Sequence, residues 1–136
     1  MADLTLNSAQ VAQVFPMESR IRTYKAAVDL VAGTPVHIDA NNKVNKADGN
    51  GASPVNRFRG ITLETVKAGQ DVDVISDGEI AGFDLSGLAY DAPVYVSDTV
   101  GALADAPGTT PLLVGRVHGM NDGAKTKVLR LTGWAG

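Results

Sequence analysis

Hydrophobic and polar residues alternate over many short stretches of this chain. The clearest case is residues 71–75, where Val72 and Val74 fall on one side and Asp71 and Asp73 on the other. Such alternation is typical of a half-buried β-strand. By the same pattern we predict strands at 36–40, 43–47, 58–63, 79–83, 94–96, 112–118 and 125–131. Turn residues separate them, and Ser76-Asp77-Gly78 is predicted to be a hairpin turn. Residues 24–31 fit a strand or a short helical run.

The first predicted strand and its surroundings recur later in the chain, because residues 32–40 match residues 90–98 with some drift. The match aligns Pro35 with Pro93, Val36 with Val94, His37 with Tyr95, Ile38 with Val96, Ala47-Asp48 with Ala104-Asp105 and Gly60 with Gly115. A self-match at a nearly fixed offset suggests two copies of one β unit. We therefore predict an all-β fold, a small β-barrel or sandwich built from two related β units (about 32–80 and 89–133) within a domain spanning 21–136.

Residues 1–20 differ from this domain and form a predicted N-terminal arm. They carry almost no charge before Pro16, and their apolar residues exceed what a free tail needs. These apolar residues are Leu4, Leu6, Val11, Val14 and Phe15. One interpretation is a frayed terminus. The other is an arm that orders on a partner, in which case residues 1 to about 16 are disordered in the free protein.

Composition excludes several classes of protein. A length of 136 residues predicts one domain, and the absence of cysteine excludes disulfides and thiolate metal sites. A net charge of −3 argues against a general nucleic-acid binder, which needs a concentrated positive surface. No apolar run approaches the roughly 18 residues of a membrane span. The first residues do not resemble a signal peptide, so we expect synthesis in the cytoplasm and no membrane partner.

Recognisable catalytic chemistry is sparse. The chain has no G-x-S-x-G, Walker, H-E-x-x-H or EF-hand motif. His37 and His118 are the only histidines, and two unclustered histidines are more often surface or interface residues than metal ligands. Asp71 and Asp73 share a strand face and fit a cation site, acid–base work or, as we favour, a solvated face that discourages edge pairing. We expect no enzyme, no metal and no cofactor.

Two aromatic positions are candidate subunit contacts. Arg57 and Arg59 flank Phe58 in the only Arg-aromatic-Arg cluster of the chain. An RNA-binding strand has this pattern too, but one triplet in an acidic protein is a weak signal. Trp134 is either a packing anchor or part of a subunit contact, where tryptophan is enriched.

Several segments, taken in order, resemble a known family. They are Tyr24-Lys-Ala-Ala, residues 32–40, Lys43-Val-Asn-Lys-Ala-Asp48, Arg59-Gly-Ile-Thr-Leu-Glu64, residues 68–74, residues 91–98 and Val114-Gly-Arg-Val117. Together they look like the small capsid decoration (cement, or head-stabilising) proteins of tailed bacteriophages. The resemblance covers roughly residues 24–132, and the arm is its least matched part.

The resemblance implies a structural virion protein on the outer surface of the expanded capsid. Proteins of this family often form homotrimers at threefold and quasi-threefold positions, where they hold neighbouring major capsid protein subunits together. In several of them an N-terminal arm lies on the capsid and can add a strand to a capsid-protein sheet. A physical reading agrees, since a clamp needs a rigid β body and an edge or arm for strand addition rather than a pocket.

Two other functions compete with this one. A receptor- or glycan-binding head fibre or adhesin module predicts an aromatic cluster on the surface, and the few aromatic residues are scattered. A small β-barrel enzyme predicts that Asp71, Asp73 and a histidine converge in a cleft.

Overall fold

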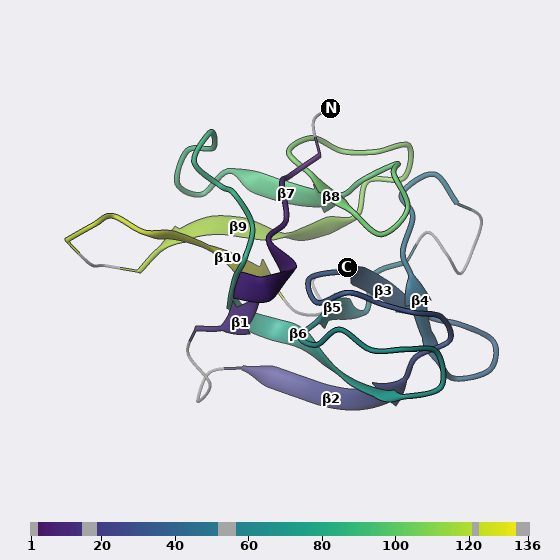
Figure 1. Cartoon of the computed structure of the whole chain (residues 1–136). Helices are drawn as coiled ribbons and strands as arrows, with labels where there is room; N and C mark the ends of the chain where they lie inside the picture. The colour runs from purple at the N-terminus through teal and green to yellow at the C-terminus, as the bar shows by residue number, and fades with distance from the viewer. Residues whose placement is uncertain (1–2, 15–18, 52–56, 121–122, 133–136) are drawn as a thin grey trace.

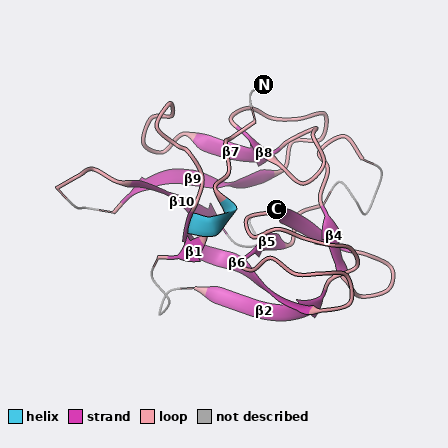
Figure 2. Cartoon of the chain, in the orientation of Figure 1, coloured by secondary structure: helices cyan, strands magenta, loops and turns pink. Residues whose placement is uncertain are grey.

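The computed structural model describes residues 3–14, 19–51, 57–120 and 123–132. In this part of the chain there are ten strands, a single 3-10 turn and no α-helix (Figures 1 and 2). The elements in chain order are η1 (Ser8–Gln10), β1 (Ala12–Gln13), β2 (Arg20–Lys25), β3 (Pro35–Ile38), β4 (Val44–Lys46), β5 (Gly60–Thr62), β6 (Asp71–Ala81), β7 (Pro93–Val96), β8 (Leu103–Ala104), β9 (Leu113–Gly119) and β10 (Lys127–Thr132). The prediction of an all-β fold is confirmed.

The strands pair antiparallel in one strongly curled sheet, a half-barrel (Figure 1). The order is β4-β3-β5-β6-β10-β9-β7-β8, and β1 and β2 also pair with β6. The long strand β6 is therefore the centre of the fold. Among the described residues, no helix is long and apolar enough to cross a membrane.

The strand order is the same when read from either end of the sheet towards its centre. One half consists, from its edge to the centre, of β4, β3, β5 and β6. The other half consists, from its edge to the centre, of β8, β7, β9 and β10, so each strand of one half has a counterpart in the other. The register agrees as well: Val36 of β3 pairs with Gly60, and Val94 of β7 pairs with Gly115. The positions that the self-match aligns therefore have equivalent partners at these strands.

One part of the self-match is wrong. His37 pairs with Asn45, whereas Tyr95 pairs with Ala104, so Asn45 rather than Ala47 is the counterpart of Ala104. The cause is a difference in turn length. Residues 39–43 connect β3 to β4, whereas residues 97–102 connect β7 to β8 with one more residue.

The hairpin predicted at residues 76–78 is also wrong, because β6 continues through it as one strand. Asp77 has a strand partner on both β2 and β10, so the ladder does not end there. Gly78 has a φ of +128° and lies against Ser19, where an added Cβ would be 2.7 Å from the hydroxyl oxygen. The Asp-Gly pair thus bends the strand without reversing it.

The core consists of two groups of buried side chains. The larger group joins both halves of the sheet and includes Ile61, Ile75, Ile80, Val94, Val96, Leu103, Val114, Val117, Leu129 and Leu131. The smaller group lies in the first half and comprises Ala26, Leu30, Val36, Val44, Val72 and Val74. Val72 and Val74 are buried as their alternation on β6 predicts, with Asp71 exposed.

Candidate functional site

The N-terminal arm lies on the β body. The amide of Leu4 donates to the carbonyl of Leu103 on β8 at 2.9 Å. The amide of Asn7 donates to Gly82 at 2.8 Å, and that of Val14 donates to Glu79 on β6 at 2.9 Å. Between these points the arm runs from β8 towards β6, as Figure 1 shows in purple. The arm therefore connects β8, in the second half of the sheet, to the central strand β6.

Apolar side chains of the arm have partners on the same chain. Leu4 and Val11 pack against the larger core group. Leu6 covers Gly33, where an added Cβ would lie 2.5 Å from a methyl carbon of Leu6. The expectation that residues 1 to about 16 are disordered in the free protein is thus wrong for residues 3–14, because half-buried leucine and valine side chains dock on their own body. Phe15 lies outside the described residues.

Two arginines and a tyrosine form what we call the Arg–Tyr cluster: Arg22, Tyr24 and Arg59. The guanidinium carbon of Arg22 lies 5.8 Å from the centre of the Tyr24 ring, and that of Arg59 lies 5.7 Å from it. Nε of Arg59 also donates to the Tyr24 hydroxyl at 2.8 Å. These are cation–π distances, so the ring holds both guanidinium groups in place.

The register of β2 against β6 explains which charges are neutralised. Thr23 donates to Asp73 at 2.6 Å, and Lys25 forms an ion pair with Asp71 at 2.9 Å. Arg22 and Tyr24 alternate with these two residues along β2. They pair with Val74 and Val72 and so belong to the other face of the strand. Asp71 and Asp73 are thus satisfied across the strand pair.

The predicted subunit contacts have different surroundings. Phe58 is partly buried and packs on the larger core group, whereas Arg57 is exposed. Arg59 belongs to the Arg–Tyr cluster. Trp134 lies outside the described residues. The triplet 57–59 therefore contributes an anchor to the core, an exposed cation and a half-buried cation, and its sequence pattern does not distinguish these roles.

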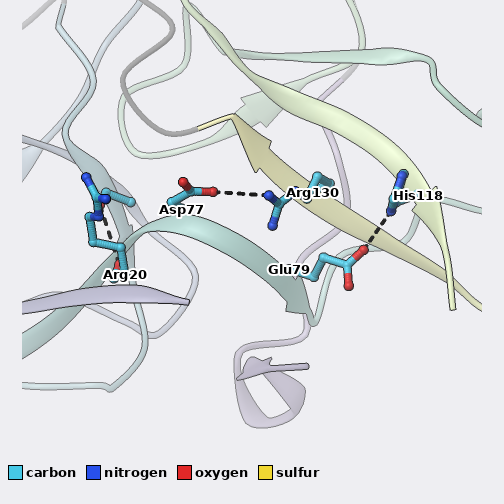
Figure 3. Close-up of polar contacts among 6 residues, drawn as sticks. Arg20, Asp77, Glu79, His118 and Arg130 are labelled. Atoms are coloured by element: carbon cyan, nitrogen blue, oxygen red, sulfur yellow. Dashed lines mark hydrogen bonds and ion pairs between the residues drawn. The ribbon is translucent and has the colours of Figure 1, made fainter. Parts of the chain in front are cut away.

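Two polar pairs on β6, β9 and β10 lie at the centre of the sheet (Figure 3). A carboxylate oxygen of Glu79 on β6 lies 2.7 Å from Nδ1 of His118 on β9. A guanidinium nitrogen of Arg130 on β10 lies 3.4 Å from Asp77. His37, in contrast, is buried on β3 and its Nδ1 lies 3.1 Å from the Lys46 carbonyl. The two histidines thus have separate partners, and no group of three potential metal ligands occurs within the described ranges.

An open groove lies between three loops of the first and second halves. Its volume is about 490 Å³, and its apolar lining includes Leu30, Val31, Val66 and Val100, with Lys46 and Lys67 among its polar residues. Val31 is 47% exposed and Val100 is 53% exposed. Both valines lie outside the strands, so strand alternation gives no signal for them.

Among the titratable groups of the described residues, Asp84 is the one whose pKa is clearly shifted. Its exposed carboxylate accepts hydrogen bonds from the hydroxyl of Ser86 at 2.6 Å and from the Ser86 amide at 3.1 Å. The hydroxyl bond, then the amide bond, lowers the pKa of Asp84 from its ordinary value of 3.8. This is the signature of an Asx turn after β6.

Comparison with known proteins gives no match: no family model, no curated protein and no solved structure matches this chain.

Proposed function

We propose that this chain is a capsid decoration protein of a tailed bacteriophage. It binds the outer surface of the expanded capsid and stabilises contacts between major capsid protein subunits. The observation that carries the proposal is the coincidence of the resembling segments with the structural elements. Residues 32–40 contain β3, residues 43–48 contain β4, residues 59–64 contain β5 and residues 91–98 contain β7. Four of the resembling segments thus each contain one whole strand, namely β3, β4, β5 or β7.

The doubled scaffold supports this role. We infer that the two halves are related β units, because their strand order and their Val–Gly pairs agree. Such a body offers repeated surfaces to a lattice. In a homotrimer at a threefold or quasi-threefold position, several weak contacts would act together and give strong overall binding.

The arm needs a more specific proposal, because it is docked on its own body. We take the capsid-bound state to be one in which the arm leaves β6 and β8. Its apolar residues Leu4, Leu6, Val11, Val14 and Phe15 then contact the major capsid protein. The backbone donors of the arm would then pair with a partner strand in place of Leu103, Gly82 and Glu79.

The alternative is a receptor- or glycan-binding head-fibre or adhesin module. Its expected feature is an open platform of aromatic rings. Tyr90 is 48% exposed, but the ammonium of Lys127 lies 5.2 Å from the centre of its ring. Tyr24 is bracketed by arginines. These occupied rings give the alternative less support.

Co-sedimentation with expanded heads tests the proposed function. We expect saturable binding of the full chain to expanded heads and increased resistance of those heads to heat. Failure of the protein to pellet with heads at any concentration would rule out the decoration role. Glycan arrays would then test the alternative.

A disulfide lock tests the role of the arm. Ala12 and Ala81 are a cross-strand pair of small residues, and the chain has no cysteine of its own. The Cα atoms of paired residues on antiparallel strands lie about 4.5–5.5 Å apart, which is within the Cα range of disulfides, so Ala12→Cys with Ala81→Cys should close on oxidation. If the arm must detach, the oxidised protein loses head binding and reduction restores it. Equal binding in both states would place the capsid contact on the β body.

A further inference from the structure

We propose that the free edge of β2 binds an extended acidic segment of a partner protein. The segment adds to β2 as a further strand, and its carboxylates meet Arg20 and Arg22. This inference deepens the proposed function and rests on it for the source of the segment, which we take to be the capsid. The arm proposal and this one concern different parts of the chain.

The edge is available because nothing else in the described chain pairs with it. β2 is six residues long and forms its ladder with β6 alone. Figure 1 shows it at the lower border of the molecule, with no strand beyond it. Its outer backbone N–H and C=O groups can therefore pair with an incoming strand.

The strands at the two ends of the sheet differ from β2 in this respect. Asp3 forms a β-bridge with Ala104, and the amide of Leu4 donates a hydrogen bond to the carbonyl of Leu103. The arm therefore covers β8. The segment after β2 covers β4, because Ala27 donates to the carbonyl of Val44 at 2.8 Å. The fold thus covers the ends of the sheet and leaves β2 open.

The charges along this edge select the partner. Arg20 and Arg22 are exposed, and neither forms an ion pair with a carboxylate within the described part of the chain. The Arg22 guanidinium is held against the Tyr24 ring, and Arg59 donates a hydrogen bond to the hydroxyl of the same tyrosine. A guanidinium held in this way loses less side-chain entropy when it binds a carboxylate. The protein carries a net charge of −3, so this cationic edge stands out from the chain as a whole.

The strand pair β2–β6 shows what sequence such an edge accepts. On β6, acidic residues at alternate positions, Asp71 and Asp73, meet Lys25 and Thr23 of β2. A partner strand with acidic residues at alternate positions would place carboxylates opposite Arg20 and Arg22 in the same way. Cations on an edge also prevent pairing with a second copy of the same edge, because like charges would face each other. A short cationic edge in an acidic protein suits a carboxylate segment better than a polyphosphate chain, which needs a broad positive surface.

Peptide titration tests the chemistry without a capsid. The probes are capped hexapeptides, Glu-Val-Glu-Val-Glu-Val and its match Gln-Val-Gln-Val-Gln-Val, added to the ¹⁵N-labelled protein. We expect the Glu peptide to shift the amide signals of residues 20–25 and the Gln peptide to shift them much less. Arg22→Gln should weaken Glu-peptide binding about tenfold, the effect of losing one charge-assisted hydrogen bond. Lys43→Gln is the matched control, because it removes one positive charge from an exposed turn.

The outcomes are distinct. Equal shifts with the two peptides, shifts away from β2, or full affinity in Arg22→Gln would overturn the inference. Shifts of the same amides by a single-stranded oligonucleotide, without any by the Glu peptide, would overturn it in favour of a nucleic-acid edge.

Head binding separates this inference from the proposed function. If wild type and Lys43→Gln pellet with expanded heads and Arg22→Gln pellets about tenfold more weakly, both stand. If all three pellet equally, the edge does not meet the capsid and the inference fails while the proposed function survives. If wild type does not pellet, the proposed function fails and, with it, the capsid as the source of the segment.

Discussion

Nδ1 of His118 lies 2.7 Å from a carboxylate oxygen of Glu79, and this contact joins β9 to β6 across β10. The Glu79 side chain is only 8% exposed, whereas that of His118 is 52% exposed. Figure 3 shows the imidazole directed towards the carboxylate over the intervening strand. Because β6 belongs to one half of the sheet and β9 to the other, the pair is a polar link between the halves, with a buried carboxylate and a half-exposed imidazole.

Replacing His118 with alanine should destabilise the fold. The buried carboxylate of Glu79 would keep its desolvation cost and lose this hydrogen-bond partner, so we expect a loss of about 1–3 kcal/mol in the free energy of unfolding. Urea denaturation of wild type and His118→Ala measures this difference.

A double-mutant cycle with Glu79→Gln supplies the control. A neutral amide costs less to bury than an unpaired carboxylate, so the double variant should lose less stability than the sum of the two single losses. Additive losses would mean that the two side chains do not interact in solution.

The sequence predicted the strands of this fold better than their connections. Alternating valines marked the buried face of β6, and the self-match at Val36 and Val94 marked equivalent strands. The hairpin predicted at Ser76-Asp77-Gly78 is wrong because local turn preference competes with strand pairing. Here both β2 and β10 pair with β6 at Asp77. Whether a glycine reverses or bends a strand depends on such distant partners.

Gly60 and Gly115 illustrate this dependence and provide a test of the repeat. An added Cβ at Gly60 would lie 2.5 Å from the carbonyl oxygen of Ile75, and one at Gly115 would overlap that of Arg130. Ile75 pairs with Ile61 and Arg130 pairs with Arg116, the residue after the glycine in each case. Both alanine variants should therefore lose about 1–3 kcal/mol or more, because a backbone carbonyl cannot move aside as a side chain can.

Gly87→Ala is the matched control for these two variants, since nothing lies within 4 Å of a Cβ added there. Its free energy of unfolding should stay within about 0.5 kcal/mol of wild type. If Gly60→Ala or Gly115→Ala were equally harmless, the close approach of strand to strand at that glycine would be disproved.

The candidate sites were less predictable than the fold. The triplet Arg57-Phe58-Arg59 drew attention to this region, but the partner that organises it, Tyr24, lies 35 residues away from Arg59 in the sequence. The arm raised the opposite difficulty. Its leucines and valines suggested a partner, and alternation alone could not show that the partner is the chain's own body. Both outcomes depend on long-range contacts that one-dimensional patterns do not contain.

Hydrogen exchange in the free protein tests the docked arm. The amides of Leu4, Asn7 and Val14 donate to carbonyls of the body, so they should exchange more slowly than an unstructured peptide. They should still exchange faster than the amides of β6 and β10, because few apolar contacts hold the arm in place. Exchange at the rate of a free peptide would restore the disordered-arm interpretation, and exchange as slow as β6 would argue against release on the capsid.

The turn at Asp84 predicts a pH dependence with a definite sign. Hydrogen bonds from Ser86 lower the pKa of Asp84, so the folded state favours the charged carboxylate more than the unfolded state does. The resulting stabilisation is present above the ordinary pKa of 3.8 and is lost as the pH falls through the lower pKa of the folded state. Wild type should therefore melt at a higher temperature than Asp84→Ala at about pH 6, and the gap should shrink at about pH 3 and below. Ser86→Ala keeps the carboxylate but removes the hydroxyl donor, so NMR titration should show the pKa of Asp84 moving back towards 3.8. A melting gap that stays the same in acid would assign the effect of Asp84→Ala to the turn backbone instead of to the charge.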